Sequence, residues 1–181
     1  MNTIKINPTT SIGFLVGIAA WSMSFITLIW GYVFYRLRAG EWLINYVDET
    51  VLTKALVNTG ILLVSSWMLH EFLQKRKTVS FIAGLLLGVL FIKAQWDLWM
   101  LLLQRGLTLK SSMAGSFLYL LTGFHALHVV VGLGILLPLG FMLSREHGSW
   151  KSENRFEFAL KFWDLLMLFW LILFILIFVF K

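Results

Sequence analysis

The sequence contains no cysteine and has little charge for its length. Among 181 residues there are two prolines, and charged residues make up 13%, against about 25% in an average soluble domain. The absence of cysteine excludes disulfides, thiolate metal clusters and thiol catalysis. The polar stretches are too short for a sizeable soluble domain. The chain is instead 59% hydrophobic, with 16 phenylalanines and 9 tryptophans, which is typical of a polytopic membrane protein.

Five apolar segments are each long enough to cross a hydrocarbon core of about 30 Å at about 1.5 Å per residue. They cover approximately residues 11–35, 51–73, 79–104, 113–143 and 157–180. Lipid restricts a spanning backbone to helices or closed barrels, and the alternation of a barrel strand is absent. We therefore predict an all-α fold, a single transmembrane bundle domain of five helices over residues 1–181.

Lysine and arginine in the short loops predict the orientation. One side of the membrane would collect seven of them and the other side five. The seven are Lys5, Lys75, Arg76, Lys77, Arg145, Lys151 and Arg155; the five are Arg36, Arg38, Arg105, Lys110 and Lys181. This bias places the N-terminus in the cytoplasm and the C-terminus outside. The net charge of +6 then reflects topology, and we expect no nucleic-acid partner and no cleavable signal peptide.

Polar residues inside the second segment follow a helical spacing. Lys54, Asn58 and Ser65 are four and seven residues apart, so a helix would carry them on one face. Small and polar residues on one face are typical of helix–helix packing. His70 comes near the end of the same segment, next to Glu71.

The third and fifth segments carry ionisable residues at membrane depth, which is costly and indicates a functional site or an internal contact. Gln95 is the best candidate for a hydrogen bond between helices. Lys93 and Asp97 could pair along one helix or extend towards the lipid headgroups. Lys161 and Asp164 are three residues apart and could face the same neighbour. A buried aspartate needs a partner, and Lys161, His125 and His128 are the candidates.

The fourth segment contains the string TGFHALHVVVG, with Thr122, His125 and His128. Two histidines at helical spacing can bind a metal or a haem, or they can pack helices. A metal site needs three or four ligands. A bis-histidine haem would need His70 on the opposite side, at a depth that matches His125 poorly. We therefore expect helix-interface contacts and no metal ligand.

No catalytic pattern is present: the sequence lacks a glycine-rich phosphate loop, a nucleophile elbow and a zinc motif. Two alternatives to a packing role remain. One is a b-type haem electron-transfer protein that uses His70 with His125 or His128. The other is a small transporter or channel. It would be built around the ionisable residues Lys54, Asp97, Lys161 and Asp164, and Pro138 is the only helix-interior proline that hints at it.

The string FLYLLTGFHALHVVVG resembles subunit III of the haem–copper respiratory oxidases, the cytochrome c oxidases and their quinol-oxidising relatives. Three further strings match the family in order: VNTGILLVSSWMLH, LLLGVLFIKAQ and FALKFWDLLMLFWLILF. Asp164 holds the family aspartate. Lys161 stands where the family has histidine, and Ser22 where its first bundle helix has an acid. Five segments resemble the shorter bacterial form.

This resemblance implies a non-catalytic accessory subunit of a proton-pumping terminal oxidase in aerobic respiration. Such a subunit packs beside catalytic subunit I, in a complex with subunit II, binds phospholipid and sustains proton uptake. The resemblance implies that haem and copper lie on the partner subunits, with no cofactor on this chain. It further implies a bacterial cytoplasmic membrane location.

From these observations we expect helix-interface contacts at eight residues: Asn58, Ser65, Gln95, Thr122, His125, His128, Lys161 and Asp164. Four basic residues at segment ends are expected either to meet lipid headgroups or to act only as topology signals. They are Arg36, Arg38, Arg76 and Lys77.

Overall fold

Five long helices make up most of the computed structural model, which describes residues 8–39, 43, 46–110, 112–145 and 150–180. The helices are α1 (Pro8–Arg38), α2 (Glu49–Lys75), α3 (Thr78–Gln104), α4 (Met113–Arg145) and α5 (Trp150–Phe174). A short π-helix, η1 (Ile175–Val179), continues α5. All five helices are long and apolar enough to cross a membrane, so the predicted polytopic all-α architecture is confirmed.

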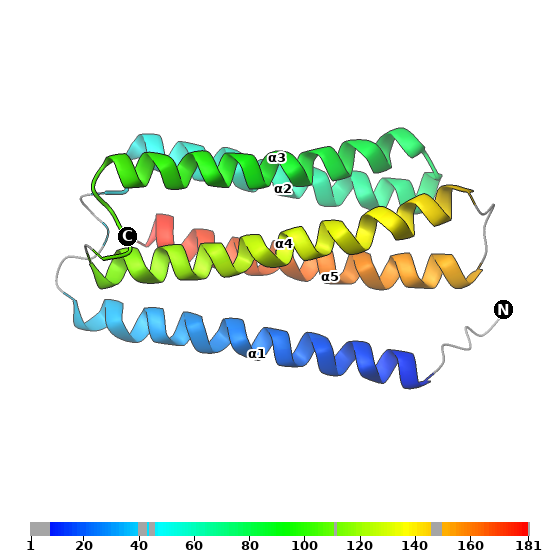
Figure 1. Cartoon of the computed structure of the whole chain (residues 1–181), viewed down its shortest axis with the longest axis horizontal. Helices are drawn as coiled ribbons and strands as arrows, with labels where there is room; N and C mark the ends of the chain where they lie inside the picture. Colours follow the sequence, from blue (N-terminus) through cyan, green and yellow to red (C-terminus); the bar gives the residue numbers. More distant parts are fainter. Residues whose placement is uncertain (1–7, 40–42, 44–45, 111, 146–149, 181) are drawn as a thin grey trace.

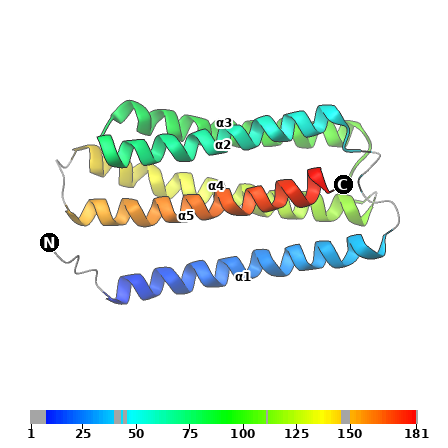
Figure 2. The ribbon, with the colours of Figure 1, turned by 180° about the vertical axis from the view of Figure 1, so that it is seen from behind.

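The helices run antiparallel in three layers (Figure 1). α2 and α3 form one layer, α4 and α5 the next, and α1 lies on the far side of α4 and α5, as the view from behind also shows (Figure 2). The connections from α1 to α2 and from α3 to α4 lie at one end of the bundle. The connections from α2 to α3 and from α4 to α5 lie at the other end.

Helix boundaries differ most from the prediction in the fifth segment. Helix α5 begins at Trp150 rather than near residue 157, because the polar stretch WKSENR is helical although it is not apolar. A hydropathy argument detects only the part of a helix that lies in lipid. The π-helix η1 at the other end of α5 was not predicted.

Polar groups cap the ends of α2. The carboxylate of Asp48 accepts a hydrogen bond of 2.9 Å from the backbone N–H of Val51, which satisfies one of the free donors at the helix start. At the other end Arg76 adopts the left-handed conformation, with φ of 54°, and its N–H bonds to the carbonyl of Phe72. Arg76 and Lys77 thus form the tight turn into α3.

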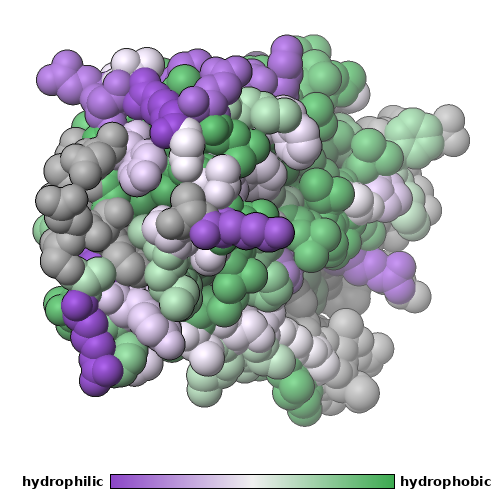
Figure 3. Space-filling model, turned by 60° about the vertical axis from the view of Figure 1, so that its left-hand side comes forward, coloured by the Kyte–Doolittle hydropathy of each residue, from purple (hydrophilic) through white to green (hydrophobic). Residues whose placement is uncertain are grey.

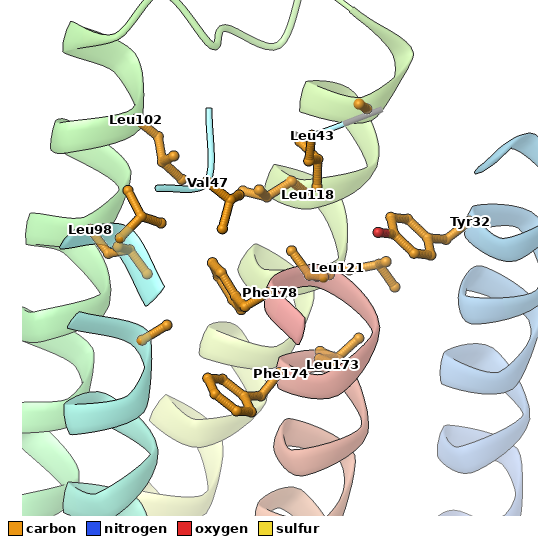
Figure 4. Packing of buried hydrophobic residues seen from close by; sticks show 14 of the residues in the cluster. Tyr32, Leu43, Val47, Leu98, Leu102, Leu118, Leu121, Leu173, Phe174 and Phe178 are labelled. Atoms are coloured by element: carbon orange, nitrogen blue, oxygen red, sulfur yellow. The ribbon is translucent and has the colours of Figure 1, made fainter. Parts of the chain in front are cut away.

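The core consists of two apolar clusters. One gathers residues near the end of the bundle that holds the C-terminal part of α5, including Leu98, Leu121 and Phe178 (Figure 4). The other lies towards the opposite end and includes Phe72, Phe156 and Trp163. Hydrophilic side chains collect on the end face seen in Figure 3, with apolar side faces beyond it. This distribution fits a bundle whose sides meet lipid.

Helix α1 is the least buried of the five. Of its membrane-spanning window, 11% is buried, against 33% to 44% in the other helices. Phe25 and Tyr32 are its fully buried large side chains, whereas Met23, Trp30 and Leu37 are exposed. Helix α1 therefore lies against α4 and α5 through a narrow strip.

Candidate functional site: polar contacts between the core helices

Helices α2 and α3 are joined by two buried hydrogen bonds. The side-chain amide of Asn58 donates to Oε1 of Gln95 at 3.0 Å. Further along the same helix pair, the hydroxyl of Ser65 donates to the carbonyl of Gly84 at 2.7 Å. Ser65 can reach this carbonyl because Gly84 lacks a side chain: a Cβ there would lie 2.8 Å from Cγ of Leu69. The small residues thus allow the two helices to approach closely.

Two tryptophans supply contacts that sequence reasoning missed. The indole N–H of Trp99 on α3 donates to the hydroxyl of Thr122 on α4 at 3.0 Å. The indole N–H of Trp170 on α5 donates to the hydroxyl of Thr59 on α2 at 3.0 Å. A buried indole N–H usually finds an acceptor, so the tryptophans inside the apolar segments were the available signal.

Asp164 on α5 binds two side chains of α2. It accepts a hydrogen bond of 2.7 Å from the hydroxyl of Ser66, and its Oδ2 lies 2.9 Å from Nε2 of His70. The sequence suggested three partners for Asp164: Lys161, His125 and His128. The structure shows Ser66 and His70 in their place. Because α2 and α5 run antiparallel, the end of the second segment lies beside the first half of the fifth.

The two histidines of α4 have different surroundings. His125 is fully buried, and its ring packs against Trp170, Phe91 and Phe25, with centroid distances of 5.1, 5.8 and 6.3 Å. Neither of its ring nitrogens has a hydrogen-bond partner among the described residues. Its contacts with other helices are therefore aromatic.

His128 faces α1. Its Nδ1 lies 2.7 Å from the carbonyl of Phe124, one turn earlier on its own helix. Its ring packs against Trp21 and Phe25 of α1, with centroid distances of 5.3 and 5.8 Å. The two histidines thus have different main neighbours: His125 packs chiefly on Phe91 of α3 and Trp170 of α5, and His128 packs on Trp21 and Phe25 of α1.

Lys161 was predicted to contact another helix, but its side chain contacts its own helix. Its Nζ lies 3.2 Å from Oε1 of Glu157 and above the ring of Phe158, both on its own helix. Its side chain is 58% exposed. Among the described residues, no hydrogen bond or ion pair joins Lys161 to another helix.

Two of the four basic residues expected at lipid headgroups, Arg36 and Arg38, contact other residues of the protein. Arg36 donates to the carbonyl of Leu176 at 3.0 Å, and the hydroxyl of Tyr32 donates to the same carbonyl at 3.1 Å. The last carbonyls of a helix lack partners within the helix, so η1 offers this acceptor to α1. Tyr32 lies between α1 and the end of α5 in Figure 4. Arg38 stacks on Phe34 at 4.2 Å.

A salt bridge ties together the loops at the same end. Nη1 of Arg105, just after α3, lies 2.6 Å from Oδ1 of Asp48, just before α2. The hydrogen bond from the Arg105 guanidinium, together with the backbone N–H of Val51, lowers the pKa of Asp48 from 3.8 to about 2. The carboxylate therefore stays ionised at neutral pH.

No group of three or more potential ligands gathers for a metal among the described residues. For a bis-histidine haem, His70 would have to leave Asp164, and His125 would have to leave its aromatic enclosure. The residues present do not fit such a group. The four ionisable residues of the transporter alternative do not share one site among the described residues. Lys161 and Asp164 bind different partners, and Lys54 and Asp97 line a cleft that neither of them borders.

An apolar cleft of about 410 Å³ lies between α1, α4 and α5. Its lining is apolar except for one basic residue, Arg155. The lining residues are Gly17, Ile18, Ile135, Leu139, Arg155, Phe158, Ala159 and Phe162. The cleft thus has an apolar wall and one positive charge, that of Arg155 near the N-terminal end of α5.

Comparison with known proteins gives one consistent family. The family model described as cytochrome c oxidase subunit III matches residues 2–181. Cytochrome c oxidase subunit 3 of Synechocystis sp. is 31% identical over 176 residues, which cover 92% of this chain and 73% of that protein. The Triticum aestivum protein of the same name is 30% identical over 178 residues, covering 90% of this chain and 65% of its own length.

The Lycodon semicarinatus protein of the same name is 29% identical over 127 residues, which cover 66% of this chain. The chain spans about half of that relative, 48% of its length, and 73% of the Synechocystis protein. The family match nevertheless extends through all five helices described above. This multi-pass membrane chain belongs to the cytochrome c oxidase subunit III family.

Proposed function

We propose that this chain is a non-catalytic accessory subunit of a proton-pumping haem–copper terminal oxidase, associated with catalytic subunit I and with subunit II. The observation that carries the proposal is the family match over residues 2–181. The contacts of the core support it. The buried polar side chains Asn58, Ser65, Gln95 and Thr122 join one helix to another, which suits a structural role.

In this role the chain stabilises subunit I, while haem and copper lie on the partner subunits. A bundle held by hydrogen bonds between helices presents a defined surface to a neighbour, because its helices cannot easily slide or rotate. The chain would lie in a bacterial cytoplasmic membrane with its N-terminus inside. Single cysteines placed in the loops of this cysteine-free chain and labelled from either side would test that orientation.

We also propose that the apolar cleft between α1, α4 and α5 holds a phospholipid acyl chain. Arg155 would lie beside the lipid phosphate, because arginine recognises phosphate oxygens with its planar guanidinium. Mass spectrometry of lipids that copurify with the chain tests this. We expect less bound lipid for Arg155→Ala than for Lys161→Ala, a matched exposed position on the same helix, and equal amounts would refute the site.

The function itself is tested by a mild-detergent pulldown of the chain from its native membrane, with an absorbance spectrum and mass spectrometry of the copurified proteins. We expect a haem–copper subunit I, and haem absorbance that follows this subunit. A chain that is monodisperse and alone, or haem that remains with this chain after separation, would contradict the proposal.

A further inference from the structure

Two ionisable residues lie on the outward side of α3, inside the membrane span. We define the α3 outer face by six exposed residues: Leu86, Leu90, Lys93, Trp96, Asp97 and Met100. Lys93 lies near the middle of the helix, about 16 Å from its C-terminal end at about 1.5 Å per residue. Asp97 follows one turn later on the same side.

These two residues differ from the other polar groups of the spans. Gln95, on the opposite side of the same helix, is buried and bound to Asn58, and Asp164 is bound to His70. In the described part of the chain, by contrast, neither Lys93 nor Asp97 takes part in an ion pair, even with each other.

Asp97 also lines a small cleft between α2 and α3. The cleft has a volume of about 180 Å³, and Lys54 of α2 lies on its other side. Lys54 is exposed as well, although it shares its spacing with the buried Asn58 and Ser65. The outward surface of α2 and α3 therefore carries two positive charges and one negative charge within the span.

Contact with lipid would be energetically unfavourable for the charged residues of this surface. A helix of 27 residues is about 40 Å long, so it extends about 5 Å beyond each side of a 30 Å hydrocarbon core. Lys93 then lies about 11 Å below the boundary, a distance that its four-carbon stem covers only in part. A charge at this depth is costly unless a partner or a water-filled cavity receives it.

We propose that the α3 outer face is a docking surface for a transmembrane helix of a partner subunit, which presents a carboxylate at the depth of Lys93. Charge complementarity selects such a partner, and a hydrogen-bond donor opposite Asp97 completes it. The apolar remainder of the face suits a protein contact, because tryptophan and methionine are enriched at interfaces. The inference rests on the proposed function, in which the partner is the catalytic oxidase subunit.

The outward face of α1 is a matched control for this surface. It is at least as exposed, with Met23 at 66% and Trp30 at 74%. The hydroxyls beside them, Ser24 and Thr27, bond to carbonyls one turn earlier on α1 itself. The outward face of α1 therefore exposes no unpaired charge to lipid at the depth of Lys93.

Photo-crosslinking in native membranes tests the docking surface, because a cysteine-free chain accepts a single reactive site. The Leu90→Cys (α3) and Met23→Cys (α1) chains are each labelled with a benzophenone maleimide in detergent, combined with membranes that lack the wild-type chain, and irradiated. We expect a cross-link from Leu90→Cys to the haem–copper catalytic subunit, identified by mass spectrometry. An adduct at Leu90→Cys with lipid alone, or with another protein alone, overturns the proposal, whatever Met23→Cys gives.

The charge is tested with Lys93→Met and Lys93→Arg, and with Lys161→Met as the control. We expect Lys93→Met to lower the catalytic subunit recovered in a mild-detergent pulldown by roughly tenfold or more, because it leaves a buried carboxylate unpaired. Lys93→Arg, which keeps the charge, and Lys161→Met should retain it. Unchanged recovery with Lys93→Met overturns the charge pairing.

The wild-type pulldown separates the proposed function from the docking surface. If the wild-type chain recovers no haem–copper subunit, the proposed function fails, and the docking surface fails with it. If the wild-type chain recovers that subunit but Leu90→Cys does not cross-link to it, only the docking surface fails.

Discussion

Nε2 of His70 lies 2.9 Å from Oδ2 of Asp164, and this contact joins the end of α2 to the middle of α5. The side chains are 44% and 35% exposed, respectively, so the pair lies at the edge of the bundle rather than in its core. The hydroxyl of Ser66 adds a second bond to the same carboxylate. Asp164 therefore fixes two turns of α2 against α5.

We expect Asp164→Ala to lower the thermal stability of the purified chain or complex. The loss of two partly exposed hydrogen bonds should cost roughly 1–2 kcal/mol, while turnover per assembled oxidase stays nearly unchanged. Thermal denaturation in mild detergent, followed by an activity assay on the intact fraction, measures both. Lys161→Ala is the control, because Lys161 contacts its own helix. Complete loss of turnover in a fully assembled Asp164→Ala complex would contradict this structural role.

Close packing of α4 on α3 can be tested at Gly140. A Cβ at this position would overlap Cε2 and Cζ of the Phe81 ring, so we expect Gly140→Ala to destabilise the bundle by roughly 1–3 kcal/mol. At Gly123 on the same helix, an added Cβ would meet no described atom within 4 Å outside its own helix backbone. Gly123→Ala should therefore be neutral or stabilising by up to about 1 kcal/mol. Equal denaturation temperatures for the two variants would argue against the packing described here.

The attachment of α1 can be tested at Tyr32 and Arg36, which share one acceptor, the carbonyl of Leu176. Tyr32→Phe and Arg36→Ala should each cost roughly 0.5–2 kcal/mol. The double variant should cost less or more than the sum, because groups with a common partner couple. A double-mutant cycle of chemical denaturation in detergent measures this coupling. Arg38→Ala, whose guanidinium stacks on Phe34 of α1, serves as the control; strict additivity would speak against a shared acceptor.

The loop ion pair predicts a defined pH dependence. The folded pKa of Asp48 is about 2, below its ordinary 3.8, first because of the hydrogen bond from Arg105. A lowered pKa stabilises the fold above the unfolded value, and this contribution is lost as the pH falls through the folded value.

The denaturation temperature of the wild type should therefore exceed that of Asp48→Asn by a constant amount above about pH 4. This difference should shrink between about pH 4 and pH 2. Thermal scans of both proteins in a non-ionic detergent across this range provide the measurement. A difference that grew on acidification would show the opposite sign and contradict the assignment.

The sequence was sufficient for the five spans, because uninterrupted apolar segments must become helices in lipid. It also pointed to Asn58 and Gln95, since amides at membrane depth need partners. It could not supply the partner of Asp164, because that depends on the antiparallel register of α2 and α5, which no local pattern encodes. Arg36 shows the same limit: its acceptor exists only because η1 ends α5 with a free carbonyl.

The tryptophans show a different limit. Sequence reasoning treated them as apolar bulk, yet Trp99 and Trp170 each donate a hydrogen bond to a threonine of another helix. Lys161 shows the reverse, because its charge suggested a contact between helices and its long side chain instead turns to Glu157. Side-chain length and helix rotation decide these cases, and both follow from packing.

The bonds that hold α1 also set an order of assembly. Tyr32 and Arg36 are separated from their common acceptor by 144 and 140 residues of chain. During synthesis α1 leaves the ribosome long before that acceptor exists, so it must wait in the bilayer while the later helices are made. Helices α2 and α3, joined by a tight turn, can pair at once. The bonds of Tyr32 and Arg36 can therefore form only after η1 has been made, whereas Trp21 and Phe25 of α1 can pack on α4 before that.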